Sequence, residues 1–95
     1  MELVSLKGLE MIPTYTATYR LGEQSGQLRI GWASWDKGRF QDRSIKWAYR
    51  DASGKVSRGC PELPFAVLVD MAILAYQQGE LSGAEVSRLK AALAR

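Results

Sequence analysis

The chain has 95 residues, which is enough for one compact domain and too few for two. Its composition is 46% hydrophobic and 24% charged, which is ordinary for a globular protein and excludes a disordered tail or a collagen-like chain. A single cysteine, Cys60, excludes a disulfide scaffold and favours a reducing, cytoplasmic setting. There is no histidine, which excludes Ser-His and Cys-His catalysis and histidine metal ligands.

The net charge of +3 is unevenly distributed along the chain. Residues 26–60 carry eight basic and three acidic side chains, which gives this middle segment a net charge of +5. A basic segment in a nearly neutral chain attracts polyanions. The alternative is that these cations only solvate the outer face of a sheet.

Neither end of the chain has the pattern of a targeting or membrane segment. Residues 1–11 carry Glu2, Lys7 and Glu10, so they lack the long apolar core of a signal peptide. The longest apolar run, residues 65–76, is interrupted by Asp70 and is too short to span a bilayer. We therefore expect a cytoplasmic protein with no membrane partner.

The first half of the chain alternates in the way that is typical of strands. Three segments show this pattern, at residues 14–21, 27–35 and 43–50. Stretches rich in turn residues separate them, at 22–26, 36–38 and 51–54. Residues 55–59 are predicted to form a fourth strand. Because the connections are short, the strands should form an antiparallel meander.

The second half of the chain is predicted to be helical. Pro61 and Pro64 suit the start of a helix near residues 63–64, and Gly79 suits its C-terminal cap. Residues 65–78 are apolar almost all round, so this helix needs cover on every side, from the sheet, the last helix or a second subunit. Ser82 and Glu85 form a capping-box pattern that begins the last helix. Its apolar stripe consists of Val86, Leu89 and Leu93.

The predicted fold is α+β: an antiparallel meander of three to four strands, followed by two C-terminal helices packed on one face of the sheet. We expect a single domain over residues 1–95, mostly β-sheet in residues 1–60 and helical in residues 61–95. The other face of the sheet would then stay open as a binding surface. The long helix is expected to serve as the core or as the interface of a homodimer, through Phe65, Leu68, Val69, Ile73 and Tyr76.

The strongest candidate site is the stretch in which basic residues alternate with aromatic ones. Basic side chains follow phosphates and aromatic rings stack on unpaired bases, so this mixture is typical of single-stranded nucleic-acid binding. The alternative is that the rings of Trp32, Trp47 and Tyr49 form the core. Trp35 is out of phase with Trp32, so without a bulge the two cannot share one face of a strand. The predicted nucleic-acid-binding residues are Arg29, Trp35, Lys37, Arg39, Phe40, Lys46, Arg50, Lys55 and Arg58.

No arrangement in the sequence indicates catalysis. Asp36, Asp42 and Asp51 lie in turns, where aspartate is common, and their spacing does not favour a pair of catalytic carboxylates. The sequence has no phosphate-binding loop, no dinucleotide fingerprint and no cluster of metal ligands. We therefore predict no catalytic residues, no metal and no cofactor, and we do not expect an enzyme.

Part of the middle segment resembles a known family. The matching residues run Lys37-Gly38-Arg39-Phe40, then residues 44–55, then Arg58-Gly59 and Leu63-Pro64. In these residues the chain resembles the single-stranded-DNA-binding transcriptional coactivators of the positive-cofactor-four type. The resemblance implies four antiparallel strands and a helix, dimerisation through the helices, and binding of single strands across the sheets. It covers less than half of the chain, and the last helix, residues 82–95, is additional.

Two functions of different kinds fit these features. The first is a small, dimeric, non-enzymatic protein that binds single-stranded DNA or RNA through a basic, aromatic-bearing sheet, with a role in transcription regulation. The second is a small phage-type inhibitor or adaptor, for example of the anti-CRISPR kind, which binds a host protein through the same surface. Exposed tryptophan and arginine residues would then be the anchors of a protein interface.

Overall fold

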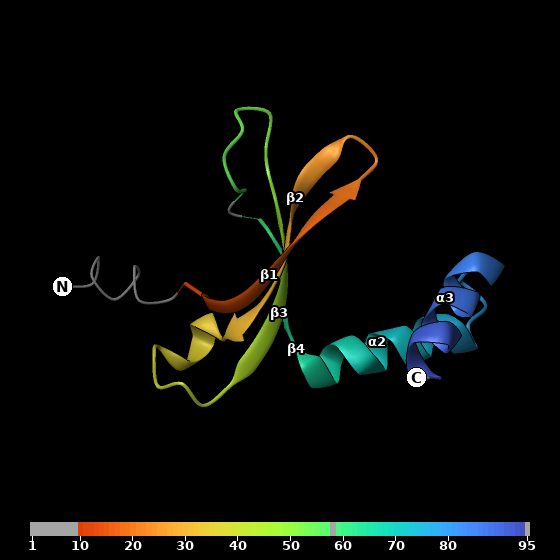
Figure 1. The fold of residues 1–95 in the computed structure, drawn as a ribbon. Helices are drawn as coiled ribbons and strands as arrows, with labels where there is room; N and C mark the ends of the chain where they lie inside the picture. The colour runs from red at the N-terminus through yellow and green to blue at the C-terminus, as the bar shows by residue number, and fades with distance from the viewer. Residues whose placement is uncertain (1–9, 58, 95) are drawn as a thin grey trace. The chain divides into compact units, whose positions relative to one another are not determined.

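The computed structural model describes residues 10–57 and 59–94. In chain order its elements are β1 (Ile12–Leu21), β2 (Gln24–Trp32), the 3-10 turn η1 (Ser34–Asp36), β3 (Arg43–Tyr49), β4 (Glu62–Pro64), α2 (Phe65–Gln77) and α3 (Gly83–Leu93). The strands form one antiparallel sheet in the order β1-β2-β3-β4 (Figure 1). The predicted α+β fold, a four-stranded meander followed by two helices, is therefore confirmed.

The chain divides into two compact units, Met1–Phe65 with the sheet and Ala66–Arg95 with the helices. We refer to them as the sheet unit and the helical unit. The boundary lies just after β4, a few residues beyond the predicted change from sheet to helix at residue 60. The expectation that the helices pack on one face of the sheet stays a prediction.

The ends of the first two strands differ from the sequence-based expectation. β1 begins at Ile12 instead of Thr14, and β2 takes in residues that were predicted to be a loop. Only Gly22 and Glu23 remain in the turn, and Gly22 has a φ of 61°. Two-residue turns with positive φ match the twist of paired strands, which explains why the strands continue so close to this turn.

The prediction of a fourth strand at residues 55–59 is wrong. Among its described residues, 55–57 and 59, this segment makes one isolated bridge, between Arg50 and Val56, and the fourth strand is the three-residue β4. The carbonyl oxygen of Pro61 accepts a hydrogen bond from the backbone N–H of Trp47, which brings the chain back to β3 just before β4. Pro64 closes β4, because proline has no N–H to continue a ladder.

The register of β2 and β3 divides the side chains between the two faces of the sheet. Leu28 lies opposite Trp47 and Ile30 opposite Ile45, as the predicted alternation requires. We call this side the aromatic face; it comprises Tyr15, Ala17, Tyr19, Leu28, Ile30, Trp32, Arg43, Ile45, Trp47, Tyr49 and Leu63. We call the other side the basic face; it comprises Thr16, Thr18, Arg20, Gln27, Arg29, Ser44, Lys46, Ala48 and Glu62.

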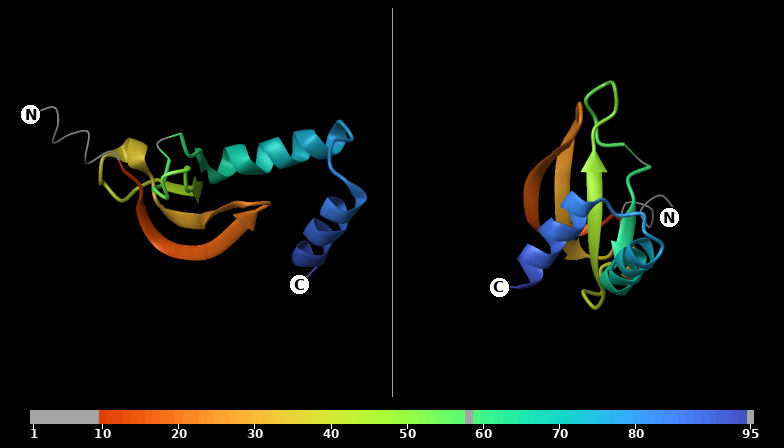
Figure 2. Two further views of the ribbon diagram at one scale, coloured as in Figure 1. Left: turned by 90° about the horizontal axis from the view of Figure 1, so that it is seen from above. Right: turned by 90° about the vertical axis from the view of Figure 1, so that its right-hand side faces the viewer.

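The sheet is strongly coiled, as the curvature of β1 and β2 in Figure 2 shows. A bulge at Thr14 shifts the register between Pro13 and Tyr15. There the backbone of β1 crosses so close to Gly31 that a Cβ on this glycine would collide with the carbonyl oxygen of Ile12. Only glycine allows this approach, and the bulge adds local twist.

A carboxylate clamp joins β4 to the start of η1 and to β3. One Glu62 oxygen accepts a hydrogen bond from the Ser44 hydroxyl at 2.7 Å and from the Ser34 backbone N–H at 3.0 Å. The other accepts the Ser34 hydroxyl at 2.8 Å. Ser44 is completely buried, so its hydroxyl depends on Glu62 for a partner.

The ends of the helices follow the sequence signals. Gly79 has a φ of 73°, and its N–H bonds to the Tyr76 carbonyl while the N–H of Glu80 bonds to that of Ala75. This pair of bonds is a Schellman motif, which ends α2. Ser82 and Glu85 form both bonds of the capping box that begins α3. Among the described residues, no helix has the length and apolar character needed to cross a membrane.

Replacing Glu62 with alanine should destabilise the sheet unit, because the buried Ser44 hydroxyl and the Ser34 N–H lose their acceptor. We expect the free energy of unfolding, measured by urea denaturation, to fall by about 1–3 kcal/mol. Glu23→Ala, in the exposed β1–β2 turn, is the matched control and should change it little. Equal losses in both variants would show that the clamp contributes nothing specific.

Candidate nucleic-acid interface

Two cations lie side by side at the centre of the basic face. Arg29 on β2 is the direct partner of Lys46 on β3. Like charges directly opposite each other disfavour a sheet, although here the Arg29 Nε donates to the Gln27 Oε1 at 3.0 Å and Lys46 has Glu62 as its partner on β4. The only acid on the basic face is Glu62, which is next to Lys46 on β4, and both of its oxygens accept hydrogen bonds from Ser34 and Ser44.

Two further arginines, Arg20 and Arg50, lie near the β1–β2 turn and the 51–54 turn; Figure 1 shows these two turns at the same end of the sheet. Arg20 is the partner of Ser25, and the N–H of Arg50 bonds to the Ser25 carbonyl. Their guanidinium groups bond to the backbone of these turns, at the carbonyls of Gly22 and Gly54. Ser25 is four residues from Arg29 along β2, which is about 13 Å. The cations therefore extend along the length of the sheet.

Arg20 was not among the predicted site residues. The signal for it was present, because Thr16, Thr18 and Arg20 alternate along one side of β1. The predicted residue Lys55 is exposed beside the 51–54 turn, where its backbone N–H bonds to Asp51. The predicted residue Arg58 lies outside the described residues.

At the opposite end of the sheet, one carboxylate organises the loop of residues 34–42. Asp36 is buried, and its oxygens accept backbone hydrogen bonds from Gly38, Gln41 and Asp42 at 2.8 to 3.2 Å. These hydrogen bonds, with that from Asp42 the strongest, lower the pKa of Asp36 below its ordinary value. The loop is therefore held in one shape by a negative charge at its centre.

This loop presents four of the predicted site residues. Trp35 is 40% exposed, and its indole N–H donates to an Asp42 oxygen at 2.9 Å. Lys37 is exposed with a φ of 57°. Arg39 is exposed, and its Nε donates to the carbonyl of Asp36. β2 ends at Trp32 and not at residue 35, so the phase conflict between its two tryptophans does not arise.

Phe40 combines a strained backbone with an exposed ring. Its φ is 57°, a left-handed conformation that costs a bulky residue about 1–3 kcal/mol. Its ring is 56% exposed and meets the edge of Trp32 with the ring centroids 5.8 Å apart. Phe40 therefore extends the aromatic face. Strain of this kind is typical of functional loops.

The alternation of basic and aromatic residues in the sequence separates into two surfaces in the sheet. Tyr19, Trp47 and Tyr49 cluster on the aromatic face, with ring centroids 5.1 and 5.8 Å apart. Among the described residues of this face the cation is Arg43, whose guanidinium lies 4.4 Å from the centre of the Trp32 ring. Cations and rings come together in the loop of residues 34–42. The sequence analysis did not identify the contact between Arg43 and Trp32.

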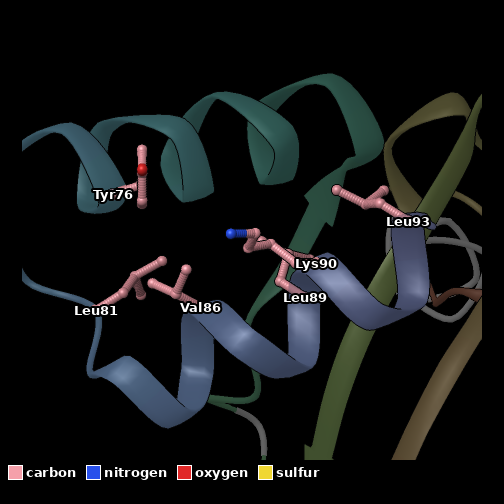
Figure 3. Close-up of a pocket in the computed structure, with 6 residues that line it drawn as sticks. All are labelled: Tyr76, Leu81, Val86, Leu89, Lys90 and Leu93. Carbon is pink, nitrogen blue, oxygen red and sulfur yellow. The ribbon is translucent and has the colours of Figure 1, made fainter.

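The helix α2 offers an apolar surface. Its residues Phe65 and Leu68 are half-buried, and Val69, Ile73 and Tyr76 are 48 to 61% exposed. A hollow of about 260 Å³ lies between Tyr76 and the apolar side of α3 (Figure 3). It is lined by Tyr76, Leu81, Val86, Leu89, Lys90 and Leu93. The role of α2 as a core or dimer helix stays a prediction.

Among residues 10–57 and 59–94, no three His, Cys, Asp or Glu side chains come together as a metal site would require. A scan against protein-family models and searches of curated proteins and of solved structures found no match to the chain. The resemblance to the positive-cofactor-four type therefore stays a prediction from the sequence. The candidate interface is defined by the geometry of the basic face and of the 34–42 loop.

Acid should destabilise the protein through Asp36 and Asp51. The folded state lowers the pKa of both carboxyl groups. For Asp51 the main cause is the hydrogen bond from the Ser53 hydroxyl. A lowered pKa adds stability above the ordinary aspartate value of about 3.9, and this stability is lost as the pH falls through the folded-state pKa. The Asp36→Asn and Asp51→Asn variants should each show a weaker loss of unfolding free energy in urea titrations from neutral pH to about 3. The double variant should show the smallest loss of unfolding free energy over this pH range. Unchanged pH profiles would contradict this assignment.

Proposed function

We propose that this protein is a non-enzymatic, cytoplasmic, single-stranded nucleic-acid-binding protein with a role in transcription regulation. The observation that carries the proposal is the Arg29–Lys46 pair on the basic face. Two like charges placed opposite each other repel, and a phosphate bound between the two cations would offset that repulsion.

The distribution of charge supports an extended polyanion as the ligand. Arg20 and Arg50 lie at one end of the basic face, Arg29 and Lys46 at its centre, and Lys37 and Arg39 in the loop at the far end. A strand lying along the sheet would meet cations over its whole length. A small anion would need only one of these clusters.

The 34–42 loop supplies a flat surface for a base. Trp35 is a large, partly exposed ring whose indole N–H is fixed by Asp42. The Asp36 hydrogen bonds hold the loop rigid, so little ordering entropy would be lost on binding. Stacking on a fixed ring suits bases that are not paired, which favours single strands over duplex.

Reversing both central charges should weaken binding and its dependence on salt. In the Arg29→Glu/Lys46→Glu variant we expect the affinity for a labelled single-stranded oligonucleotide, measured by fluorescence anisotropy, to fall at least about 100-fold at low salt. The slope of log K against log salt should become shallower by about 1.4, which is two phosphate contacts on a single strand.

The matched control is Arg88→Glu/Lys90→Glu, which makes the same change of net charge on exposed residues of α3. It should leave the salt slope unchanged. Equal losses in the two variants would mean that only net charge matters. If the unaltered protein does not bind the oligonucleotide even at low salt, the proposal is wrong and the basic face has to be treated as a protein interface, as in an inhibitor or adaptor.

Truncating Trp35 should separate stacking from charge. Trp35→Ala is expected to lower oligonucleotide affinity by about 1–3 kcal/mol, the contribution of one stacked base. The salt slope should not change, because no phosphate contact is lost. Trp35→Phe keeps a flat ring and should retain most of the affinity, although it loses the hydrogen bond to Asp42. Full affinity in the alanine variant would remove Trp35 from the interface.

A further inference from the structure

The two edges of the sheet are very different. β4 has three residues and ends in Pro64, so it offers almost no ladder to another strand. β1 has ten residues, is hydrogen-bonded only to β2 among the described strands, and is exposed along its length except at Ala17. Sheet proteins usually protect long edges with charges, prolines or bulges. Residues 14–19 carry no charge, and the bulge and Pro13 lie at one end only.

The backbone groups of β1 that point away from the sheet can be identified from the bonds of β2. The carbonyl of Ser25 and the N–H of Ala33 bond on the β3 side, and the carbonyl of Ile30 accepts a bond from Thr14 on the β1 side. Backbone direction alternates along a strand, so Gly26, Leu28 and Ile30 face β1. Their partners Tyr19, Ala17 and Tyr15 therefore point inward.

It follows that the N–H and C=O groups of Thr16 and Thr18 point out from the edge, where another strand can pair with them. The residues around them form a palindrome, Tyr15-Thr16-Ala17-Thr18-Tyr19. If two copies of β1 pair antiparallel about Ala17, each tyrosine lies opposite a tyrosine and each threonine opposite a threonine. Cross-strand aromatic pairs and Thr–Thr pairs both stabilise sheets.

We propose that β1 is a homodimerisation edge that pairs with β1 of a second copy about a two-fold axis at Ala17. A two-fold axis requires that one surface be complementary to itself, and the palindrome meets this requirement. The outward backbone groups of Thr16 bond to those of Thr18 in the second copy, and those of Thr18 bond to Thr16 in the second copy. Tyr15 is 64% and Tyr19 is 36% exposed, so both rings have surface left to bury against each other. The two sheets would become one of eight strands, whether or not the basic face binds nucleic acid.

A cysteine at the proposed axis tests the register directly. In a Cys60→Ser background, Ala17→Cys places two thiols at a non-hydrogen-bonded pair with Cα atoms about 4.5 Å apart, inside the range for a disulfide. Thr18→Cys is the matched control, because its counterpart lies diagonally at about 7–8 Å, beyond that range. Under mild oxidation we expect a covalent dimer from Ala17→Cys and little from Thr18→Cys, on non-reducing gels of the full chain.

Charge substitutions test the same pairing without cross-linking. The T16K/T18K chain sets like charges opposite each other twice, so its dimer dissociation constant in sedimentation equilibrium should rise about tenfold. The T16E/T18E chain should behave in the same way, and a mixture of the two should form heterodimers. Both side chains are exposed, but Thr16 lies opposite Arg29, so urea denaturation of each variant has to show that the fold is retained.

A monomeric unaltered protein would overturn the proposal. So would a dimer in which Ala17→Cys fails to cross-link while Ile73→Glu, on the apolar surface of α2, abolishes association. That result would assign the dimer to the helices.

Discussion

The register between β2 and β3 is the constraint on which the rest of the sheet unit depends. With Leu28 opposite Trp47 and Ile30 opposite Ile45, large apolar side chains of both strands gather on one face. A shift of one residue would move them all to the other face, among the cations. The same register brings Arg29 opposite Lys46, so the candidate interface is a direct consequence of the packing on the reverse side of the sheet.

A four-stranded sheet has little interior of its own, and hydrogen bonds from buried or half-buried carboxylates help to stabilise it. Among the described residues the buried apolar side chains are only Met11, Ala33 and Ala48, together with the polar Asp36 and Ser44. Asp36 closes the 34–42 loop, and Glu62 ties β4 to the chain beside it. Both carboxylates act through bonds to backbone or hydroxyl groups, which hold their strength better than exposed ion pairs.

The two proposals concern different surfaces of one sheet, each with groups that lack a favourable partner within the sheet. On the basic face the unsatisfied feature is a pair of like charges, which an anion would relieve. On the β1 edge it is a row of backbone groups, which a strand would relieve. Phosphate binding depends on side chains and salt, whereas edge pairing depends on backbone direction and on the palindrome around Ala17. Ala17 lies on the aromatic face, so its substitution tests edge pairing without changing the basic face, whereas Thr16 and Thr18 belong to both the edge and the basic face.

Local sequence patterns were enough to predict the α+β class, the strand β3, the turn at Gly54, the end of α2 at Gly79 and the capping box at Ser82. Each depends on residues close together in the chain: alternation, a positive φ or a cap. The position of β4 was missed because it depends on contacts of Pro61 and Glu62 with residues 14 to 28 positions earlier. Only pairing across strands separated the rings from the cations, brought Arg20 onto the basic face and left β1 as the free edge. Composition and alternation specify what each strand carries, but the register decides what lies beside it.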